Sequence, residues 1–474
     1  MNYMEEYRRW MDYPSLPREL AREMEAMDED ARKGAFGGQL QFGTAGMRGV
    51  MGPGPNLLNI YTVRRAALGM AAWLAGTNLP KRCAIGHDSR HNARLFTEVC
   101  SCAFAEYGIE VQLYHELAPT PMLSFAVRAL HCGCGIVISA SHNSGEYNGV
   151  KCYGPDGCQL TDAPAAVVME KIAAIDVLTE GKKPFAQWMA EGLIREIPLS
   201  LWEQYYETVL HEGLRLREVP DAHLKVVYTP LCGAGNRPVR EILKRIGVET
   251  RVVSCQELPD GDFKTCEYPN PETDAALAES YRLAKEAPCD LILGTDPDCD
   301  RIAVAVPVED GFRKFTGNEL GCLLLDYILS SIPNLPERAF AVRSIVTTDM
   351  ADRICAHYGC EMRGVLTGFK WIGGEILKEE TLGGQYLFGF EESCGYLKGT
   401  YARDKDAVVA AMLVCEMAAW YKGKGQNLSQ AMDALYARYG YTLAKVISCE
   451  LTGSDAMERR RHGWKHCAPM PLRS

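Results

Sequence analysis

Short apolar runs alternate with longer amphipathic stretches along almost the whole chain, and this alternation restricts the fold more than any other feature. The apolar runs have the length of buried strands and lie at Cys83–Gly86, Gly135–Ser139, Lys225–Tyr228, Leu291–Leu293, Ile302–Val306 and Arg343–Thr347. The amphipathic stretches predict helices at Leu57–Leu74, Asp274–Glu286 and Ala407–Tyr421. Strands that alternate with helices are typical of βαβ units, so the sequence predicts an α/β protein with mainly parallel sheets.

The alternation is interrupted at two places, which divide the 474 residues into three units. The first break is the segment Gly181–Trp188, which precedes a helical stretch at Leu199–Leu210, and the second is Ser330–Arg338. Three units agree with a length of roughly 150 residues per domain. The first 35 residues are rich in charged side chains and predict a helical extension ahead of the first unit.

The composition is that of an ordinary globular protein. With 47% hydrophobic and 24% charged residues, the chain is neither disordered nor collagenous. Its net charge of −10 argues against a nucleic-acid partner or an anionic membrane. The first residues lack the apolar core of a signal peptide, and no apolar stretch has the length of a membrane span. The nineteen cysteines are scattered, without a C-x-x-C pair, so we expect reduced core thiols and a cytoplasmic protein.

The segment Gly294–Arg301, G-T-D-P-D-C-D-R, predicts a metal site. In an extended segment alternate side chains point the same way, so Asp296, Asp298 and Asp300 would share one face. Three ionised carboxylates this close repel one another unless a cation lies between them, and oxygen ligands of this kind suit Mg²⁺. The alternative is a solvated acidic loop. The strands predicted on both sides favour the metal site, because α/β proteins build their sites at strand ends.

A second candidate is Ile136–Lys151, in which an apolar strand leads into a loop of small polar residues. Ser141 lies there beside His142 and Asn143, so its hydroxyl could act as a nucleophile with a neighbouring group to activate it. The alternative is a turn that uses its serines and asparagines only for local hydrogen bonds. The segment is not a G-x-S-x-G elbow, which disfavours a lipase-like hydrolase.

Three glycine-rich segments add charged and polar groups. Arg48 lies in Phe42–Gly49 and Lys370 in Thr367–Gly373, a combination suited to binding phosphate but also found in ordinary turns. The third segment offers side chains that could bind sugar hydroxyls, namely Glu391, Glu392 and Ser393. The chain has no G-x-x-x-x-G-K-[ST] loop and no convincing G-x-G-x-x-G, so neither nucleotide hydrolysis nor dinucleotide binding is supported.

Together and in this order, four segments resemble the α-D-phosphohexomutase family. They read F-G-T-A-G-M-R-G-V-M-G-P-G, S-A-S-H-N, G-T-D-P-D-C-D-R and G-F-E-E-S-C-G-Y, and they are most similar to the phosphoglucomutase-2/phosphopentomutase branch. The resemblance extends from about Phe36 to Gly453. It implies mixed α/β domains around a cleft: residues 1–205 with the phosphoserine loop, 206–325 with the metal loop and 326–450 with the sugar-recognition loop. Residues 451–474 would then be a remnant or aberrant start of a fourth domain.

The same resemblance assigns roles to residues. It implies that Ser141 is phosphorylated, that Lys151 is the general base or acid, and that Arg48 and Arg301 hold the phosphoserine region. The expected catalytic residues are Ser141, Lys151, Arg48 and His142. The expected substrate-binding residues are Glu391, Ser393, Lys370, Arg403, Lys405 and Arg301. The expected metal ligands are Asp296, Asp298 and Asp300, together with the phosphate on Ser141.

The implied reaction interconverts glucose 1-phosphate and glucose 6-phosphate. A phosphoserine enzyme passes its phosphoryl group to the sugar phosphate, and the bisphosphate intermediate returns the other phosphate to Ser141. The expected cofactors are Mg²⁺ and glucose 1,6-bisphosphate, and the expected partner is a small-molecule sugar phosphate, with no nucleic acid or membrane. Phosphopentomutase, phosphomannomutase and bisphosphate-synthesising activities of the same branch stay open, and an aspartate-nucleophile phosphatase is a further alternative.

One departure from the family concerns its fourth domain, which carries an R-x-S-G-T-E-P-like phosphate-binding loop. No such segment occurs in this sequence, and the family pattern fades just after Leu451–Arg459. We therefore expect a truncated chain, with a shifted reading frame as one explanation of the unpatterned end. Such a chain would keep Mg²⁺ binding but have poor mutase activity, or be a non-catalytic remnant.

Overall fold

The computed structural model describes residues 2–43 and 46–444. The predicted remnant of a fourth domain at residues 451–474 therefore lies outside the described residues. Within the described part, no helix is long and apolar enough to cross a membrane. All of the described cysteines except Cys255 and Cys289 are buried.

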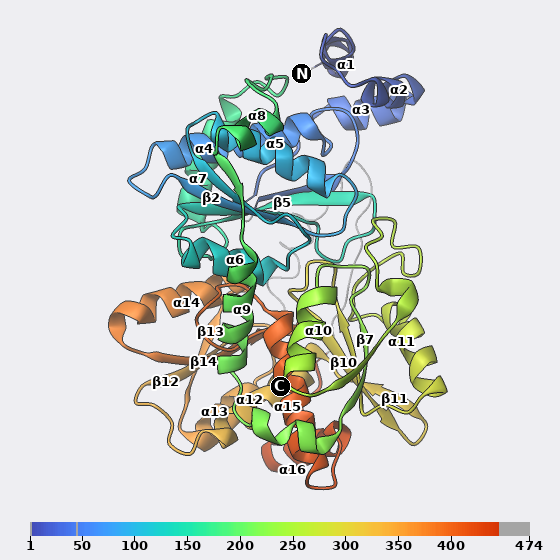
Figure 1. Cartoon of the computed structure of the whole chain (residues 1–474), viewed down its shortest axis with the longest axis vertical. Coiled ribbons are helices and arrows are strands. Elements are labelled where there is room, and N and C mark those ends of the chain that lie inside the picture. The colour runs from blue at the N-terminus through green and yellow to red at the C-terminus, as the bar shows by residue number, and fades with distance from the viewer. Residues whose placement is uncertain (1, 44–45, 445–474) are drawn as a thin grey trace, which may run out of the picture. The chain divides into compact units, whose positions relative to one another are not determined.

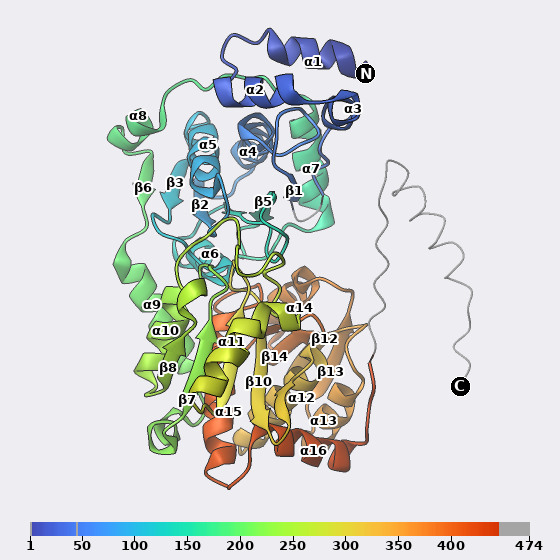
Figure 2. The same cartoon turned by 90° about the vertical axis from the view of Figure 1, so that its right-hand side faces the viewer.

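Three helices precede the first sheet and confirm the predicted helical extension (Figures 1 and 2). They are α1 (Tyr3–Met11), α2 (Arg18–Ala26) and α3 (Glu29–Phe36). Asn2 and Asp28 begin α1 and α3 by accepting hydrogen bonds from backbone amides of the first turn. The rings of Trp10 and Phe36 meet edge to face at 5.9 Å, and the Trp10 ring also meets Tyr61 at 5.3 Å. Tyr61 belongs to the helix Ile60–Ala75 beside the first sheet, so these aromatic contacts join α1 and α3 to that helix.

The first sheet has the strand order β1-β5-β4-β2-β3-β6. Its strands are β1 (Gly46–Val50), β2 (Arg82–His87), β3 (Glu110–Leu113), β4 (Cys134–Ile138), β5 (Tyr147–Tyr153) and β6 (Ile194–Glu196). Its helices are α4 (Ile60–Ala75), α5 (Ala93–Ala105), α6 (Thr120–Ala129), α7 (Asp162–Ala173) and α8 (Phe185–Ala190). Figure 1 shows α4 and α5 on one face of the sheet and α6 on the other. The strands β2, β3, β4 and β6 are parallel to one another, β5 pairs antiparallel with β4, and the edge strand β1 pairs antiparallel with β5.

The second sheet has the order β11-β10-β9-β7-β8 and also combines parallel and antiparallel pairs. Its strands are β7 (Lys225–Thr229), β8 (Glu249–Val252), β9 (Leu291–Thr295), β10 (Ile302–Val308) and β11 (Gly311–Lys314). The helix α9 (Leu199–His211) precedes it, and α10 (Asn236–Arg245) and α11 (Asp274–Glu286) connect its strands. Strands β9 and β10 form an antiparallel hairpin whose turn contains the three aspartates.

The third sheet has the order β13-β12-β14-β15. Its strands are β12 (Ala339–Ser344), β13 (Glu361–Val365), β14 (Gln385–Glu391) and β15 (Gly395–Leu397). Its helices are α12 (Gly317–Ser331), α13 (Met350–Tyr358), α14 (Phe369–Leu382), α15 (Ala407–Lys422) and α16 (Leu428–Tyr439). Three mixed sheets with helices confirm the predicted α/β class. The domain boundaries stay predictions, and the one between residues 325 and 326 falls inside α12.

The strand predicted at Arg343–Thr347 was wrong in its position. The strand β12 ends at Ser344, and Ile345 and Val346 lie in a turn, more than half exposed. β-Branched residues favour a strand, but here their apolar side chains are not covered by the third sheet's helices. The true strand, Ala339–Ser344, lies between β13 and β14, and its residues are mostly buried.

The helix α15 connects the second and third sheets through one continuous core. It is apolar all round and almost entirely buried, as expected for a helix enclosed by protein. Its side chains Val408 and Met412 belong to the same buried cluster as Leu291 and Val304 of the second sheet and Phe388 of the third. The residues before this helix, around Lys405, are therefore held beside the β9–β10 turn.

Candidate active site

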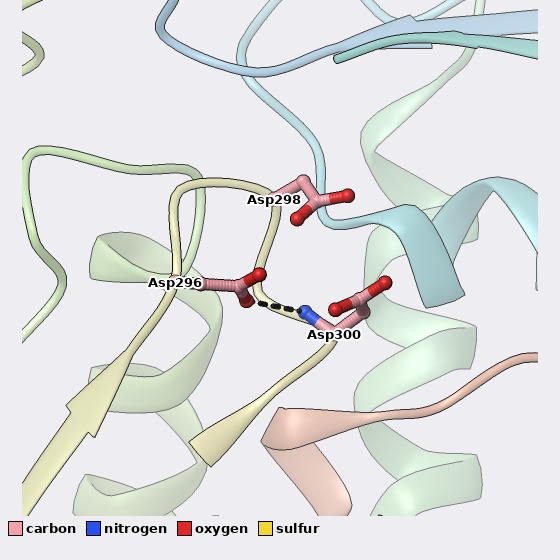
Figure 3. A group of neighbouring side chains, drawn as sticks. All are labelled: Asp296, Asp298 and Asp300. Atoms are coloured by element: carbon pink, nitrogen blue, oxygen red, sulfur yellow. Dashed lines mark hydrogen bonds between the residues drawn. The ribbon is translucent and has the colours of Figure 1, made fainter. Parts of the chain in front are cut away.

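Three buried carboxylates converge in the turn between β9 and β10 (Figure 3). Asp296, Asp298 and Asp300 each offer an oxygen, and these oxygens all lie within 4.8 Å of one another. The prediction that they share a face of an extended segment was wrong, because residues 296–300 form a turn. Backbone amides of Asp300 and Arg301 donate to Asp296 Oδ1 at 3.1 and 3.0 Å, which folds the turn back on itself. The carboxylates converge because the chain reverses, not because residues alternate.

Burial and the surrounding charges shift the pKa values of the three carboxyl groups in different directions. Burial, together with the charges of Asp300 and Asp298, holds the pKa of Asp296 well above its ordinary value. Burial also opposes ionisation of Asp298, but the charge and hydrogen bond of Lys151 hold its pKa below the ordinary range. For Asp300, burial and Asp298 act to raise the pKa, and the cations Lys405 and Lys151 lower it overall.

The trio also fits a metal ion by its unused oxygens. Asp298 Oδ1 and Asp300 Oδ1 are buried and have no hydrogen-bond partner among the described residues. A buried charged oxygen without a partner is costly, and a cation removes that cost. Carboxylate oxygens are the ligands that Mg²⁺ prefers. The residues present therefore fit a hard divalent cation.

Ser141 follows β4 and points at this trio. Its Oγ donates to Asp296 Oδ2 at 2.8 Å and lies 3.3 Å from His142 Nδ1. Ser141 has a φ of +52°, a left-handed conformation that costs a residue with a side chain roughly 1–2 kcal/mol. Its amide donates to Ser139 Oγ at 2.8 Å, which helps to hold that conformation. Strained residues of this kind cluster at functional sites.

Two buried lysines face the trio from other strands and loops. Lys151 on β5 donates to Asp298 Oδ2 and lies 3.4 Å from Asp300 Oδ2. Lys405, which precedes α15, lies 3.2 Å from Asp300 Oδ2 and 3.0 Å from Asp404 Oδ1. Burial alone would lower the pKa of both amines, but the facing carboxylates raise the pKa of both above the ordinary value. Both lysines are therefore ammonium cations at neutral pH.

A cavity of about 200 Å³ opens beside Ser141 and collects residues from all three sheets' segments. It is lined by Gly46, Met47, Arg48, Ser139, Ser141, Val150, Lys151, Gln159, Asp300, Arg301 and Lys405. Arg48 Nη1 donates to Asn143 Oδ1 at 2.8 Å, and Arg301 Nη1 donates to Glu272 Oε1 at 3.1 Å. A small polar cavity with several cations suits a phosphorylated ligand.

His142 lies beside the serine and not in the cavity wall. Burial and the nearby cations Arg301 and Arg48 lower the pKa of its imidazole to about 3. The imidazole is therefore neutral at neutral pH, so one of its ring nitrogens can donate a hydrogen bond and the other can accept one.

The structure does not bring the other predicted substrate-binding residues to this cavity. Arg403 is fully buried and donates to Glu380 and to the carbonyl oxygens of Thr400 and Ala402. Lys370 Nζ lies 3.0 Å from Asp162 Oδ1. Glu391 is 4% exposed and accepts from the amide of Gly368 at 2.7 Å, and burial raises its pKa. Ser393 is half-buried.

Sequence reasoning missed three residues that the structure brings to the site. Thr120 Oγ1 donates to Asp298 Oδ2 at 2.7 Å, and its amide donates to the carbonyl oxygen of Asp298 at 2.9 Å. Gln159 lines the cavity, and Arg90 binds the backbone of the Ser141 loop. The D-S-R sequence after β2 was a signal for Arg90, since a charged residue directly after a parallel strand is at a site edge. Nothing in the sequence marks Gln159.

Comparisons with known proteins agree along the chain. Residues 39–178, 203–309 and 316–439 match three families described as phosphoglucomutase/phosphomannomutase, alpha/beta/alpha domains I, II and III. The phosphoglucomutase of Staphylococcus epidermidis is 34% identical over 420 residues, which are 88% of this chain and 76% of that protein. The phosphoglucomutase of a bovine Staphylococcus aureus strain is 33% identical over 431 residues, 90% of this chain and 77% of that protein.

Solved structures show the same architecture. A putative phosphomannomutase from Thermus thermophilus has a TM-score of 0.72 at 26% identity, over 85% of each chain. The Paramecium parafusin structure, named as a phosphoglucomutase, has a TM-score of 0.62 at 17% identity and shares the fold, over 85% of this chain and 76% of that one.

Proposed function

This chain belongs to the phosphoglucomutase/phosphomannomutase family of phosphosugar mutases, and from that membership we propose that it interconverts glucose 1-phosphate and glucose 6-phosphate. The single observation that carries the proposed mechanism is the hydrogen bond from Ser141 Oγ to Asp296 Oδ2. It joins a nucleophile-type hydroxyl to a cluster of carboxylates suited to a divalent cation. That pairing supports a phosphoserine intermediate.

We propose that the phosphoryl group moves between Ser141 Oγ and a sugar hydroxyl. The bond from phosphorus to Ser141 Oγ breaks, and a bond from phosphorus to the sugar oxygen forms, which gives a sugar bisphosphate. The sugar hydroxyl loses a proton and the serine oxygen gains one. Lys151 lines the same cavity and carries a proton, which supports it as the group through which the proton passes. The second phosphate of the bisphosphate then returns to Ser141.

The residues proposed to hold Mg²⁺ are Asp296, Asp298 and Asp300. Bound Mg²⁺ would supply positive charge that offsets the charge of the transferring phosphoryl group. The cations Arg48, Arg301 and Lys405 are proposed to bind phosphate oxygens, because they line the cavity beside Ser141. Glucose 1,6-bisphosphate is proposed as the compound that first loads Ser141.

The sugar preference is a separate proposal with a second candidate. The names of the Staphylococcus relatives favour glucose phosphates. The likeness to the Thermus putative phosphomannomutase favours mannose phosphates as the second candidate. The proposed location is the cytoplasm, and the buried thiols of the described cysteines are consistent with a reducing compartment.

The test combines turnover with the site of phosphorylation. Purified protein is incubated with Mg²⁺, a catalytic amount of glucose 1,6-bisphosphate and either glucose, mannose or ribose 1-phosphate, and the isomerised product is measured. Intact-protein and peptide mass spectrometry then locate the phosphate. We expect fastest turnover with glucose 1-phosphate, phosphate on Ser141, and loss of both in Ser141→Ala. Phosphate on Asp296 instead would identify an aspartate-nucleophile phosphatase and refute the mutase mechanism.

A further inference from the structure

The guanidinium of Arg90 contacts two loops. One loop carries Ser141, and the other connects β8 to α11 in the part of the chain that forms the second sheet. The Ser141 loop, with the first residue of β5, comprises residues 139–147, and the second loop, which we call the capping loop, comprises residues 258–264. We propose that Arg90 and Phe263 form a positioning pair that holds the Ser141 hydroxyl in place relative to the aspartate trio. This inference rests on the proposed phosphoryl transfer from Ser141.

Arg90 binds the backbone of the Ser141 loop at four points. Its Nη2 donates to the carbonyl oxygen of Ser141 at 2.7 Å and to that of Asn143. Its Nη1 donates to the carbonyl oxygens of Ser144 and Tyr147 at 2.7 and 2.8 Å. The side chain is fully buried. A planar fork of five donors can bind four carbonyl oxygens in fixed directions, which a lysine ammonium cannot do.

Phe263 covers the same guanidinium from the capping loop. Arg90 Cζ lies 5.1 Å from the centre of the Phe263 ring, and Phe263 is 1% exposed. Phe263 has a φ of +50°, a left-handed conformation that bulky side chains rarely adopt. The loop holds it there, because Phe263 N donates to the Asp260 carbonyl oxygen at 3.2 Å and Asp262 N donates to Asp260 Oδ1 at 3.1 Å. The capping loop is therefore folded to present this ring to Arg90.

The Ser141 loop and the capping loop are in close contact, and His91, the residue after Arg90, also contacts the capping loop. A Cβ added at Gly145 would lie 2.6 Å from the carbonyl oxygen of Gly261, and one added at Gly261 would lie 2.8 Å from the amide nitrogen of His91. His91 Nε2 and Asp262 Oδ1 lie 2.5 Å apart at the same junction. A shift of either loop would therefore move the other. Phosphoryl transfer depends on positioning, and small displacements of the reacting oxygen reduce its rate.

The test compares Phe263→Leu with Phe312→Leu. Phe312 lies on β11, the edge strand of the second sheet at the opposite end from β8. Phe312 stacks on Tyr281 at 5.0 Å. Three readouts are taken for each variant: Tm, kcat and KM for glucose 1-phosphate, and amide hydrogen exchange in residues 139–147. Phe263→Tyr keeps the ring and serves as the conservative variant, and Arg90→Lys keeps the charge but loses the fork.

We expect Phe263→Leu to lower kcat about tenfold with KM changed less than about twofold, and to speed exchange in residues 139–147. Arg90→Lys should act in the same direction and more strongly. Phe263→Tyr should keep kcat within about twofold of wild type. Phe312→Leu should lower Tm without changing kcat or exchange in that segment.

Two results would overturn the proposal. One is equal kcat and equal exchange in Phe263→Leu and Phe312→Leu variants of matched Tm, and the other is a loss in Phe263→Leu that appears only in KM. The exchange measurement does not require turnover. A wild-type protein without mutase activity would therefore refute the proposed function, while exchange would still show whether the pair holds the loop.

Discussion

Ser141 Oγ and Asp296 Oδ2 are joined by a hydrogen bond of 2.8 Å across 155 residues of sequence. The serine follows a strand of the first sheet, and the aspartate begins the turn between two strands of the second. The bond is buried, and Asp296 has no exposed surface. A hydroxyl and a carboxylate shielded from water interact more strongly than they would at a surface. Such a site suits the proposed phosphoryl transfer, in which charge develops at the serine oxygen.

Mg²⁺ should stabilise the wild-type protein and not Asp298→Asn. A cation that binds only the folded state raises its stability by about 2.7 kcal/mol at a concentration of 100 Kd. Asp298→Asn removes one charged ligand from the trio, so the rise in Tm with added Mg²⁺ should be largely lost. Thermal unfolding with and without Mg²⁺ measures this.

Asp310→Asn is the matched control, because Asp310 lies in the exposed turn between β10 and β11. Its Tm should respond to Mg²⁺ as in wild type. An equal Mg²⁺ response in all three proteins would show that the ion does not bind the trio.

Thr120→Val should weaken Mg²⁺ binding although Thr120 is not a ligand. Thr120 Oγ1 orients Asp298 by donating to its Oδ2, and valine has the same shape without the donor. Loss of a group that orients a ligand typically costs about tenfold or more in metal affinity. Calorimetric titration with Mg²⁺ measures the affinity, with Thr120→Ser as the variant that keeps the hydroxyl. If the Thr120→Val and Thr120→Ser variants bind Mg²⁺ with equal affinity, the hydroxyl does not orient Asp298.

We expect the free energy of unfolding of the wild-type protein to fall, relative to that of Asp88→Asn, as pH rises from about 4 to about 6. Burial raises the pKa of Asp88 to about 6 in the folded protein, although the charge of Arg90 acts to lower it. A raised pKa means that the folded state favours the protonated form. The associated stability is present below the ordinary pKa and is lost as pH passes the raised value.

The expected change in the difference is roughly 3 kcal/mol across that interval. Denaturant unfolding of both proteins at pH 4 and pH 7 measures it. A difference in the free energy of unfolding that stays constant, or that moves in favour of wild type with rising pH, would contradict the prediction.

Gly317→Ala should destabilise the protein, whereas Gly374→Ala should stabilise it. Both glycines lie in helices, where alanine is ordinarily favoured by up to about 1 kcal/mol. A Cβ at Gly317 would lie 2.0 Å from the Glu392 carbonyl oxygen, but one at Gly374 meets nothing within 4 Å. Displacing that backbone should cost about 1–3 kcal/mol.

Denaturant unfolding of the two variants gives the sign directly. The Gly317 variant should also change turnover, because Glu392 and Ser393 belong to the predicted sugar-recognition loop. A stabilised Gly317→Ala would show that this loop does not pack against α12 as closely as in the structure.

The order of helices and strands followed from local patterns. The helix Asp274–Glu286 and the start of the strand at Ile302 were predicted to the residue, because amphipathic and β-branched runs mark them without reference to the rest of the chain. The misplaced strand at Arg343–Thr347 shows the limit of such patterns, since exposure of Ile345 and Val346 depends on what packs nearby.

Chemistry-bearing motifs were likewise visible in the sequence, because residue type determines what a group can bind or donate. Their partners were not. Thr120 contacts Asp298 from elsewhere in the chain, and Arg90, whose guanidinium lies against Phe263, binds the Ser141 loop. Arg403 is buried and instead pairs with Glu380, which is partly exposed. The sequence by itself determined the α/β class and the reactive groups, through local periodicity and side-chain chemistry. Only the tertiary structure decided which groups meet, because contacts between distant segments depend on how whole sheets and helices pack.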